Sequence, residues 1–150
     1  MATTAADQVF VDTNIVVFSS VPAAPLHAEA VQKMQALRLA GAELWFSRQI
    51  LREFLVTVTR PQTFLQPLSG AAAAVEAAKL LALFAIAEDG PAVTTNLLTL
   101  CATIPMGGKQ IHDANIVATM QANGIAKLLT HNTADFTRFQ SLITILPLVP

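Results

Sequence analysis

The sequence predicts an α/β sandwich built on a mainly parallel sheet. Short apolar runs alternate with longer helical patterns along most of the chain, which is typical of strands joined by crossover helices. The first run, "VFV" at 9–11, is continuously β-branched or aromatic, the pattern of a strand covered on both faces. In such sheets ligands bind at the carboxyl ends of strands, near a switch in strand order.

Each element has a local signal. Glycines 41 and 124 end two helical patterns, and Ser47 is a suitable N-cap for a third, which stops where Pro61 pushes the preceding residue out of the helical region. We expect strands at 8–11, 42–46, 83–89, 126–130 and 142–146. We expect helices at 25–41, 47–59, 69–82, 92–103 and 110–124, and a short helical turn at 134–139.

Length and composition set the broad class. A chain of 150 residues suffices for one domain with a substantial core, so we expect one domain over 1–150. With 53% hydrophobic and 13% charged residues, the chain is core-forming rather than disordered. The net charge of −1 and the lack of a Lys/Arg cluster argue against a high-affinity, sequence-indifferent nucleic-acid binder. They do not exclude a nuclease that binds RNA transiently through a metal.

No segment predicts export or membrane insertion. The N-terminal stretch "MATTAADQ" has no basic region followed by an apolar run. The longest uncharged window, 90–108, contains Pro91, Pro105 and several polar residues, which argues against a transmembrane helix. We therefore expect a cytoplasmic protein with no membrane partner.

Asp12 directly follows the first predicted strand, where a parallel sheet carries its chemistry. Two interpretations are open. The side chain could cap a following helix by accepting from amides near Asn14 and Ile15, or it could belong to a functional site. Because burying an unpaired charge costs several kcal/mol, a carboxylate at this place needs a hydrogen bond, an ion pair or a cation.

Three further acids follow or flank predicted strands. Glu53 falls at the border of the apolar face of the 47–59 helix, where simple exposure is an equal alternative. Asp113 lies on the face that the 110–124 helix should bury. Asp135 follows the fourth predicted strand, where helix capping is again an alternative.

Polar residues accompany three of the four acids: Thr13 and Asn14, His112, and Thr130 with Asn132. His112 is not needed as a base, and we interpret it as a hydrogen-bonded residue at a helix start. Clustered carboxylates repel one another, so a site built from four of them implies a divalent cation. Oxygen-only ligation suits Mg²⁺ or Mn²⁺ rather than Zn²⁺.

Four segments, in this order and spacing, resemble the motifs of PIN domains, and most closely those of VapC-like toxins of bacterial toxin–antitoxin pairs. They are "VFVDTNI", "SRQILREFL" followed by "TRP", "GGKQIHDANIVATM" and "LLTHNTADFTRF". The resemblance runs from about Val9 to Phe139. It implies a three-layer α/β/α sandwich with a central mainly parallel sheet and an acidic cleft that binds Mg²⁺ or Mn²⁺ and cleaves RNA.

The resemblance also implies roles for individual residues. The catalytic acids would be Asp12, Glu53, Asp113 and Asp135, and the metal would be held by Asp12, Asp113 and Asp135. In this family the last acid varies in place, so Asn132 could fill the fourth position instead.

The implied supporting residues are polar or basic. Asn14, Thr130 and Asn132 would orient the acids. Lys109 and Arg52 are the cations nearest in sequence to the acidic motifs and are candidate contacts to phosphate, with simple solvation as the alternative.

The implied function is a metal-dependent endoribonuclease, the toxin of a toxin–antitoxin pair, with an antitoxin protein and a second copy of the chain as partners. The alternative is a catalytically inactive PIN-like module that binds RNA or protein, since a fold does not guarantee activity. Acids at all four positions favour the enzyme. The sequence does not indicate which RNA is cut.

Overall fold

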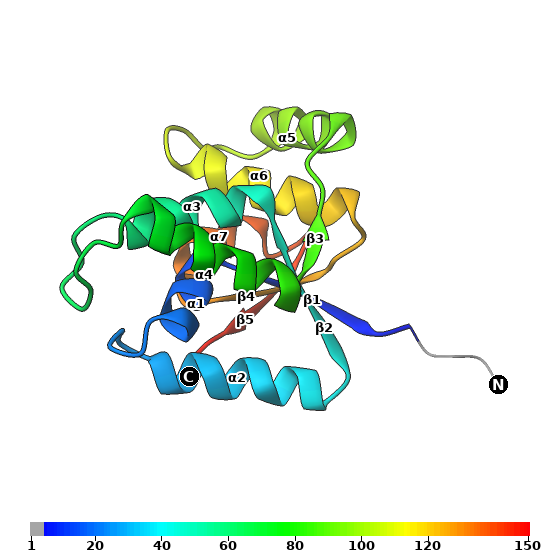
Figure 1. Ribbon diagram of the computed structural model, residues 1–150. Helices are drawn as coiled ribbons and strands as arrows, with labels where there is room; N and C mark the ends of the chain where they lie inside the picture. The colour runs from blue at the N-terminus through cyan, green and yellow to red at the C-terminus, as the bar shows by residue number, and fades with distance from the viewer. Residues whose placement is uncertain (1–4) are drawn as a thin grey trace.

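Five strands form one sheet in the order β3-β2-β1-β4-β5, and every pairing between neighbours is parallel (Figure 1). This computed structural model describes residues 5–150. Residues 1–4, part of the stretch in which we expect no export signal, lie outside the described residues. The strands are β1 (Asp7–Val11), β2 (Ala42–Ser47), β3 (Ala85–Ala87), β4 (Lys127–Thr130) and β5 (Thr144–Pro147).

Helices connect each strand to the next along the chain. They are α1 (Thr13–Ser20), α2 (His27–Leu39), α3 (Arg48–Val58), α4 (Gly70–Leu83), α5 (Pro91–Thr103), α6 (Gln110–Ala122) and α7 (Thr133–Phe136), followed by a 3₁₀ helix (Thr137–Phe139). Among residues 5–150 none of these helices has the length and apolar character that crossing a bilayer requires.

The helices form two layers, one on each face of the sheet. Helices α1 to α4 connect β1 to β2 and β2 to β3, while α5 to α7 make the connections that run in the opposite direction across the sheet. Right-handed crossovers therefore place the two groups on opposite faces. The contacts agree, since α1 packs on α2 and α3, α3 packs on α4, and α6 packs on both α5 and α7. The predicted α/β/α sandwich is confirmed.

The central strands are buried on both faces. In β1, Val9, Phe10 and Val11 are fully inaccessible to solvent, as are Leu128 and Leu129 in the neighbouring β4. These five residues belong to the hydrophobic core that the helices of both layers cover. The continuous apolar run of β1 thus has the environment that its sequence predicts.

The strand order switches direction between β1 and β4. From β1 the chain moves outward through β2 and β3, and it then returns to the other side of β1 to form β4 and β5. At such a point the two crossovers lie on opposite faces, which leaves a crevice at the carboxyl ends of the two strands. Asp12 follows β1 and Thr130 ends β4, so both are placed at this crevice.

One helix was not among the expected elements, and the bounds of several others differ from the sequence prediction by one or two residues. The unexpected helix is α1, which begins directly after Asp12, as the capping interpretation of Asp12 requires. The predicted strand at 83–89 is reduced to Ala85–Ala87 because α4 continues to Leu83. The last strand starts at Thr144 rather than at 142, and Leu142 is exposed.

Candidate functional site

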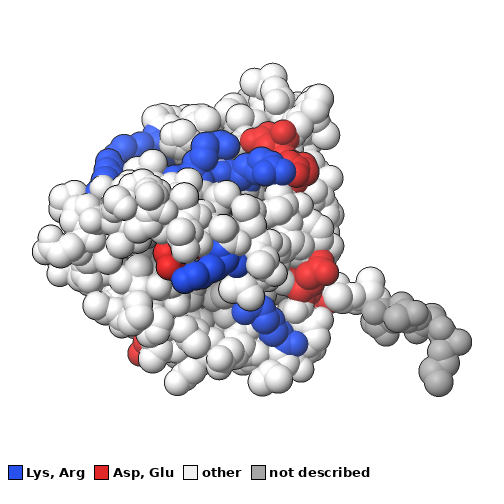
Figure 2. All heavy atoms as spheres, viewed as in Figure 1, with Lys and Arg blue, Asp and Glu red and all other residues white. Residues whose placement is uncertain are grey.

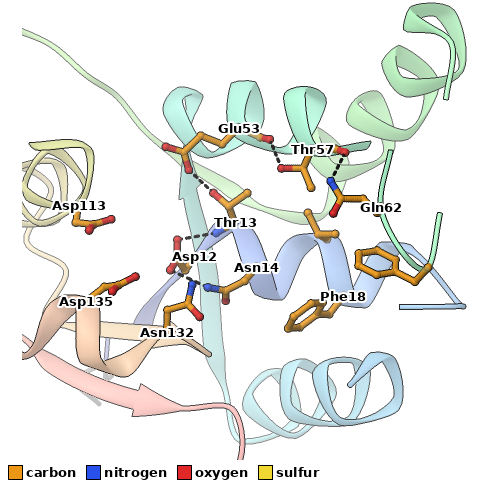
Figure 3. Close-up of a pocket in the computed structure, with 12 residues that line it drawn as sticks. Asp12, Thr13, Asn14, Phe18, Glu53, Thr57, Gln62, Asp113, Asn132 and Asp135 are labelled. Atoms are coloured by element: carbon orange, nitrogen blue, oxygen red, sulfur yellow. Dashed lines mark hydrogen bonds between the residues drawn. The ribbon is translucent and has the colours of Figure 1, made fainter. Parts of the chain in front are cut away.

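A cleft at the switch between β1 and β4 brings the four predicted acids together. It encloses about 350 Å³, the lower end of the range for ligand sites. Four separate segments contribute its walls: α1 with the residue before it, α3 with the following loop, α6, and the segment after β4 (Figure 3). The lining residues are Asp12, Thr13, Asn14, Val17, Phe18, Glu53, Thr57, Gln62, Phe64, Asp113, Asn132 and Asp135.

Asp12 is the most buried of the four acids, with 7% of its surface exposed. Its Oδ1 accepts from the backbone N–H of Thr13 at 2.8 Å and so caps α1. Its Oδ2 accepts from Thr130 Oγ1 at 2.8 Å and from Asn14 Nδ2 at 3.2 Å. Asn14 Oδ1 in turn accepts from the backbone N–H of His131 at 3.0 Å, which ties α1 to the end of β4. Asp12 therefore caps α1, through the amide of Thr13 rather than those of Asn14 and Ile15, and it also lines the cleft.

Glu53 is half-buried on α3 and is held by two neutral donors. One oxygen accepts from Thr13 Oγ1 at 2.5 Å and the other from Gln49 Nε2 at 2.9 Å. Gln49 is itself buried, donates to the backbone carbonyl of His112 at 2.9 Å and accepts from Asn115 Nδ2 at 2.8 Å. This glutamine thus joins α3, which carries Glu53, to α6, which carries Asp113.

Asp113 and Asp135 face the same cleft from the opposite layer of helices (Figure 3). Asp113 is half-buried in the first turn of α6, and Asp135 is exposed in α7. Neither carboxylate accepts a hydrogen bond from another described residue. Their oxygens are therefore available to water or to a cation.

The electrostatics show that the acids share one environment. Burial raises the pKa of Asp12 to about 6, and the charge of Glu53 adds to the rise, against hydrogen bonds from Thr130, Thr13 and Asn14 that lower it. The pKa of Asp113 is also raised to about 6, first by desolvation and then by the charges of Asp135, Asp12 and Glu53. The charges of all three other acids thus affect the pKa of Asp113.

Asn132 also lines the cleft, and its backbone N–H donates to Thr130 Oγ1 at 3.1 Å. Both candidates for the fourth position, Asp135 and Asn132, are therefore close enough to take part. The charge of Asp135 acts on Asp113, whereas Asn132 carries none. Which of the two fills the fourth position stays a prediction.

The donor set fits a hard divalent cation in chemistry. Among residues 5–150, no three carboxylate, imidazole or thiol side chains are already placed to hold one ion. Mg²⁺ does not need such a cage, because it usually binds through one or two carboxylates and keeps several waters. Asp113 and Asp135, whose carboxylates accept no hydrogen bond from another described residue, are the two that could supply such ligands, with Asp12 beside them. Reduced repulsion between the acids would favour its binding.

Basic side chains lie beside the cleft rather than in it. A second hollow, of about 430 Å³, shares Thr13, Glu53 and Thr57 with the cleft and is lined on its other side by Arg52, Arg60 and His112. Figure 2 shows basic side chains in a row across the upper part of one face, in the region where Figure 1 draws α3. Lys109 is exposed before α6 and lines neither hollow.

Several site residues were not predicted from the sequence. Gln49 lies four residues before Glu53, a spacing that places the two on one helix face. Arg138 lies three residues after Asp135, and its charge lowers the pKa of Asp113. Helical spacing could have indicated both. Phe64 lies in a loop, and no periodic signal connects it with the acids.

Removing one charge from the cleft should stabilise the metal-free protein. The pKa of Asp113 in the folded protein, about 6, lies above its unfolded value of 3.8. Asp113 therefore contributes to the free energy of unfolding at low pH, and this stabilisation is lost as the pH rises through about 6. Asp113→Asn removes this repulsion and breaks no hydrogen bond. At pH 7 in EDTA it should add roughly 0.5 to 1 kcal/mol to the free energy of unfolding, a range that allows for solvent screening.

Urea denaturation between pH 4 and pH 7 measures this effect. Glu43→Gln is the matched control, because Glu43 is an exposed carboxylate on β2 outside the cleft. An Asp113→Asn variant that is less stable than the wild type at pH 7 in EDTA would contradict a shared acidic site.

Comparison with known proteins identifies the family. The PIN domain family model matches residues 9–142, most of the chain. No curated protein sequence matches this chain. A chain of VapBC2 from Rickettsia felis, solved with a promoter DNA fragment, superposes with a TM-score of 0.65 at 14% identity and covers 93% of this chain and 98% of that one.

Two further structures show the same fold. VapBC-1 from nontypeable Haemophilus influenzae has a TM-score of 0.66 at 15% identity, covering 95% of this chain and 99% of the other. The sarcin–ricin loop cleaving toxin VapC20 from Mycobacterium tuberculosis has a TM-score of 0.59 at 18% identity, covering 80% and 86%. Together with the family match, which spans all four acidic segments, these findings confirm the resemblance: the chain belongs to the PIN domain family.

Proposed function

We propose that this protein is a metal-dependent endoribonuclease, the toxin of a bacterial toxin–antitoxin pair. The observation that carries the proposal is the convergence of Asp12, Glu53, Asp113 and Asp135 on one cleft at the switch point of the sheet. Structurally similar proteins include toxins found with their antitoxins, and one of them cleaves the sarcin–ricin loop. They support the proposal at the level of the fold.

The proposed reaction is hydrolysis of an RNA phosphodiester bond by water. A bound Mg²⁺ or Mn²⁺ would polarise a phosphodiester oxygen and lower the pKa of the attacking water. Asp12, Asp113 and Asp135 would hold the ion. Thr130 and Asn14 fix the Asp12 carboxylate by hydrogen bonds, so its orientation is set before any ligand arrives.

Glu53 is suited to orient the attacking water. Each of its oxygens accepts one hydrogen bond, from Thr13 and from Gln49, and each keeps a further lone pair. A carboxylate whose two oxygens are both fixed in this way can hold a water in one orientation. In-line attack on the phosphorus requires the water to be oriented in this way. Gln49 acts through Glu53 and is a positioning residue.

The alternative is an inactive PIN-like module that binds RNA or protein. Two properties of the cleft oppose it. The charges of neighbouring acids raise the pKa of Asp12 and of Asp113, and this repulsion costs stability unless a cation binds. A cleft lined by four carboxylates also repels RNA unless a cation intervenes.

The partner proposals rest on a surface beside the cleft. A hollow between the end of α1, α3 and α4 is lined mainly by apolar side chains: Val21, Pro22, Phe54, Val58, Leu65 and Leu68. We propose that an antitoxin segment packs in this region and places an arginine among the carboxylates. A homodimer is also proposed, and sedimentation tests it.

Cleavage should depend on the acids and on a divalent ion. We expect Asp113→Asn to lower the rate of single-stranded RNA cleavage by about 100-fold or more, while Glu43→Gln leaves it unchanged. EDTA should abolish cleavage, and added Mn²⁺ should restore it. Asp113 is preferred to Asp12 for this test, because an amide at position 12 would disturb three hydrogen bonds. No cleavage by the wild type in Mg²⁺ or Mn²⁺ would favour the inactive module. Full activity of Asp113→Asn, or cleavage undiminished by EDTA, would contradict a metal-dependent site built on these acids.

The arginines of the second hollow should bind phosphate. Replacing Arg52 or Arg60 by alanine should weaken binding of RNA to the Asp113→Asn variant. The slope of log affinity against log salt concentration should become shallower by about 0.7 for each arginine replaced. Lys79→Ala is the control, since Lys79 pairs with Glu76 on α4 outside this hollow. Salt titrations of binding measure the slope, and equal slopes for all variants would remove these arginines from the RNA path.

Expression should reveal the antitoxin. Produced alone, the wild type should arrest growth and degrade RNA, whereas co-expression with the neighbouring open reading frame should relieve both effects. Asp113→Asn, produced alone, is the control that separates toxicity from mere overexpression. A wild type that is harmless alone and copurifies with no small protein would contradict the toxin role.

A further inference from the structure

The end of the cleft away from Asp113 and Asp135 carries two aromatic rings and an amide. Phe18, Phe64 and Gln62 line the same cleft as the acids, and Figure 3 shows Phe18 and Gln62 on its far side. Asn14 and Phe18 are four residues apart on α1 and share one face of the helix. Phe18 therefore lies about one helical turn, roughly 6 Å, further along α1 than Asn14.

The loop that carries Phe64 is fixed by backbone hydrogen bonds. The N–H of Gln62 donates to the carbonyl of Leu65 at 3.1 Å, and the N–H of Leu65 donates to the carbonyl of Gln62 at 3.3 Å. These two bonds close a tight turn of four residues, of which Phe64 is the third. The N–H of Leu68 donates to the carbonyl of Val58 at 2.9 Å and ties the loop to the end of α3. Phe64 is half-buried, so part of its ring is accessible from the cleft.

Phe18 and Gln62 are also held in place. The half-buried Phe18 ring meets the His131 ring edge-on, with centroids 5.7 Å apart and planes at 68°. Gln62 Nε2 donates to the backbone carbonyl of Thr57 at 3.2 Å. The acceptor Oε1 and the second hydrogen of the Nε2 amide make no hydrogen bond to another described residue. A donor and an acceptor therefore remain beside the two rings.

We propose that Phe18, Phe64 and Gln62 form a binding site for an unpaired RNA base next to the cleaved phosphodiester. Aromatic side chains stack on bases of single-stranded RNA, and a side-chain amide can pair with a base edge. A strand with its phosphate at the acids brings the adjoining base to this end of the same cleft. The inference rests on the proposed nuclease function and assigns the substrate class as single-stranded RNA.

An apolar side chain of a protein partner is the competing occupant. It would fill the space between the rings but would leave the Gln62 amide unpaired, which is unfavourable for a polar group that becomes covered. The base is therefore favoured, and the test separates the two.

The experiment compares two short single-stranded RNAs that differ in one position. The cut sites of the intact RNA are mapped first, and the second RNA carries an abasic residue beside one of them. We expect the wild type to cleave the bond next to the abasic residue about tenfold more slowly than the same bond in the intact RNA. The double variant Phe18→Leu/Phe64→Leu should lose this difference, and Phe64→Tyr should keep it.

Thr63→Ala is the matched control, because Thr63 is exposed in the same turn and does not line the cleft. Equal cleavage beside the abasic residue and beside a base, or a double variant that discriminates as Thr63→Ala does, would overturn the base site. Neither result would contradict the proposed nuclease activity, because the RNA would still be cleaved.

Binding gives a readout that does not need cleavage. In Ca²⁺, the affinity of the wild type for the two RNAs should differ several-fold, and the double variant should not distinguish them. If no RNA is cleaved but this difference appears, the nuclease proposal fails and the base site holds. Equal binding of both RNAs, together with loss of a protein partner in the double variant, would assign the rings to the partner instead.

Discussion

Repulsion between four carboxylates at the carboxyl ends of β1 and β4 is the constraint on which the site depends. The protein meets it mainly with neutral donors. Thr130, Asn14 and the Thr13 amide hold Asp12, and Thr13 and Gln49 hold Glu53. Hydrogen bonds of this kind fix the position of an ionised group without cancelling its charge. Asp12 and Glu53 are therefore fixed in position while the repulsion among the four acids remains for a cation to relieve.

Asp12 shows how one side chain can serve the fold and the site together. Its two oxygens do different work, since Oδ1 caps α1 and Oδ2 receives the donors from Asn14 and Thr130. The cap sets where α1 begins, and α1 then carries Thr13, Asn14 and Phe18 into the cleft. A change at Asp12 consequently alters the backbone as well as the chemistry, which makes Asp113 the more selective probe.

The sheet and the four acids were easier to predict from the sequence than the residues that surround the acids. Alternating apolar runs and capping signals set most element boundaries, and strand ends brought the acids to one edge of a parallel sheet. The apolar run after Asp12 was harder, because "NIVVF" suits a buried strand as well as a buried helix. Helical spacing places Gln49 beside Glu53 and Arg138 beside Asp135. The hydrogen bonds of Gln49 to α6 and the effect of Arg138 on Asp113 depend on the tertiary fold, which local patterns do not encode.

The two ends of the cleft differ in what they can distinguish. A phosphodiester is the same at every step of an RNA chain, so the acidic end can act on any sequence that reaches it. Selectivity must come from groups that meet bases, or from the shape that admits a strand. At the base site that we propose, these groups are Phe18, Phe64 and Gln62, and the last two belong to a loop tied to α3 by hydrogen bonds. Variation in that loop could therefore change the RNA that is recognised while the acids and the chemistry stay the same.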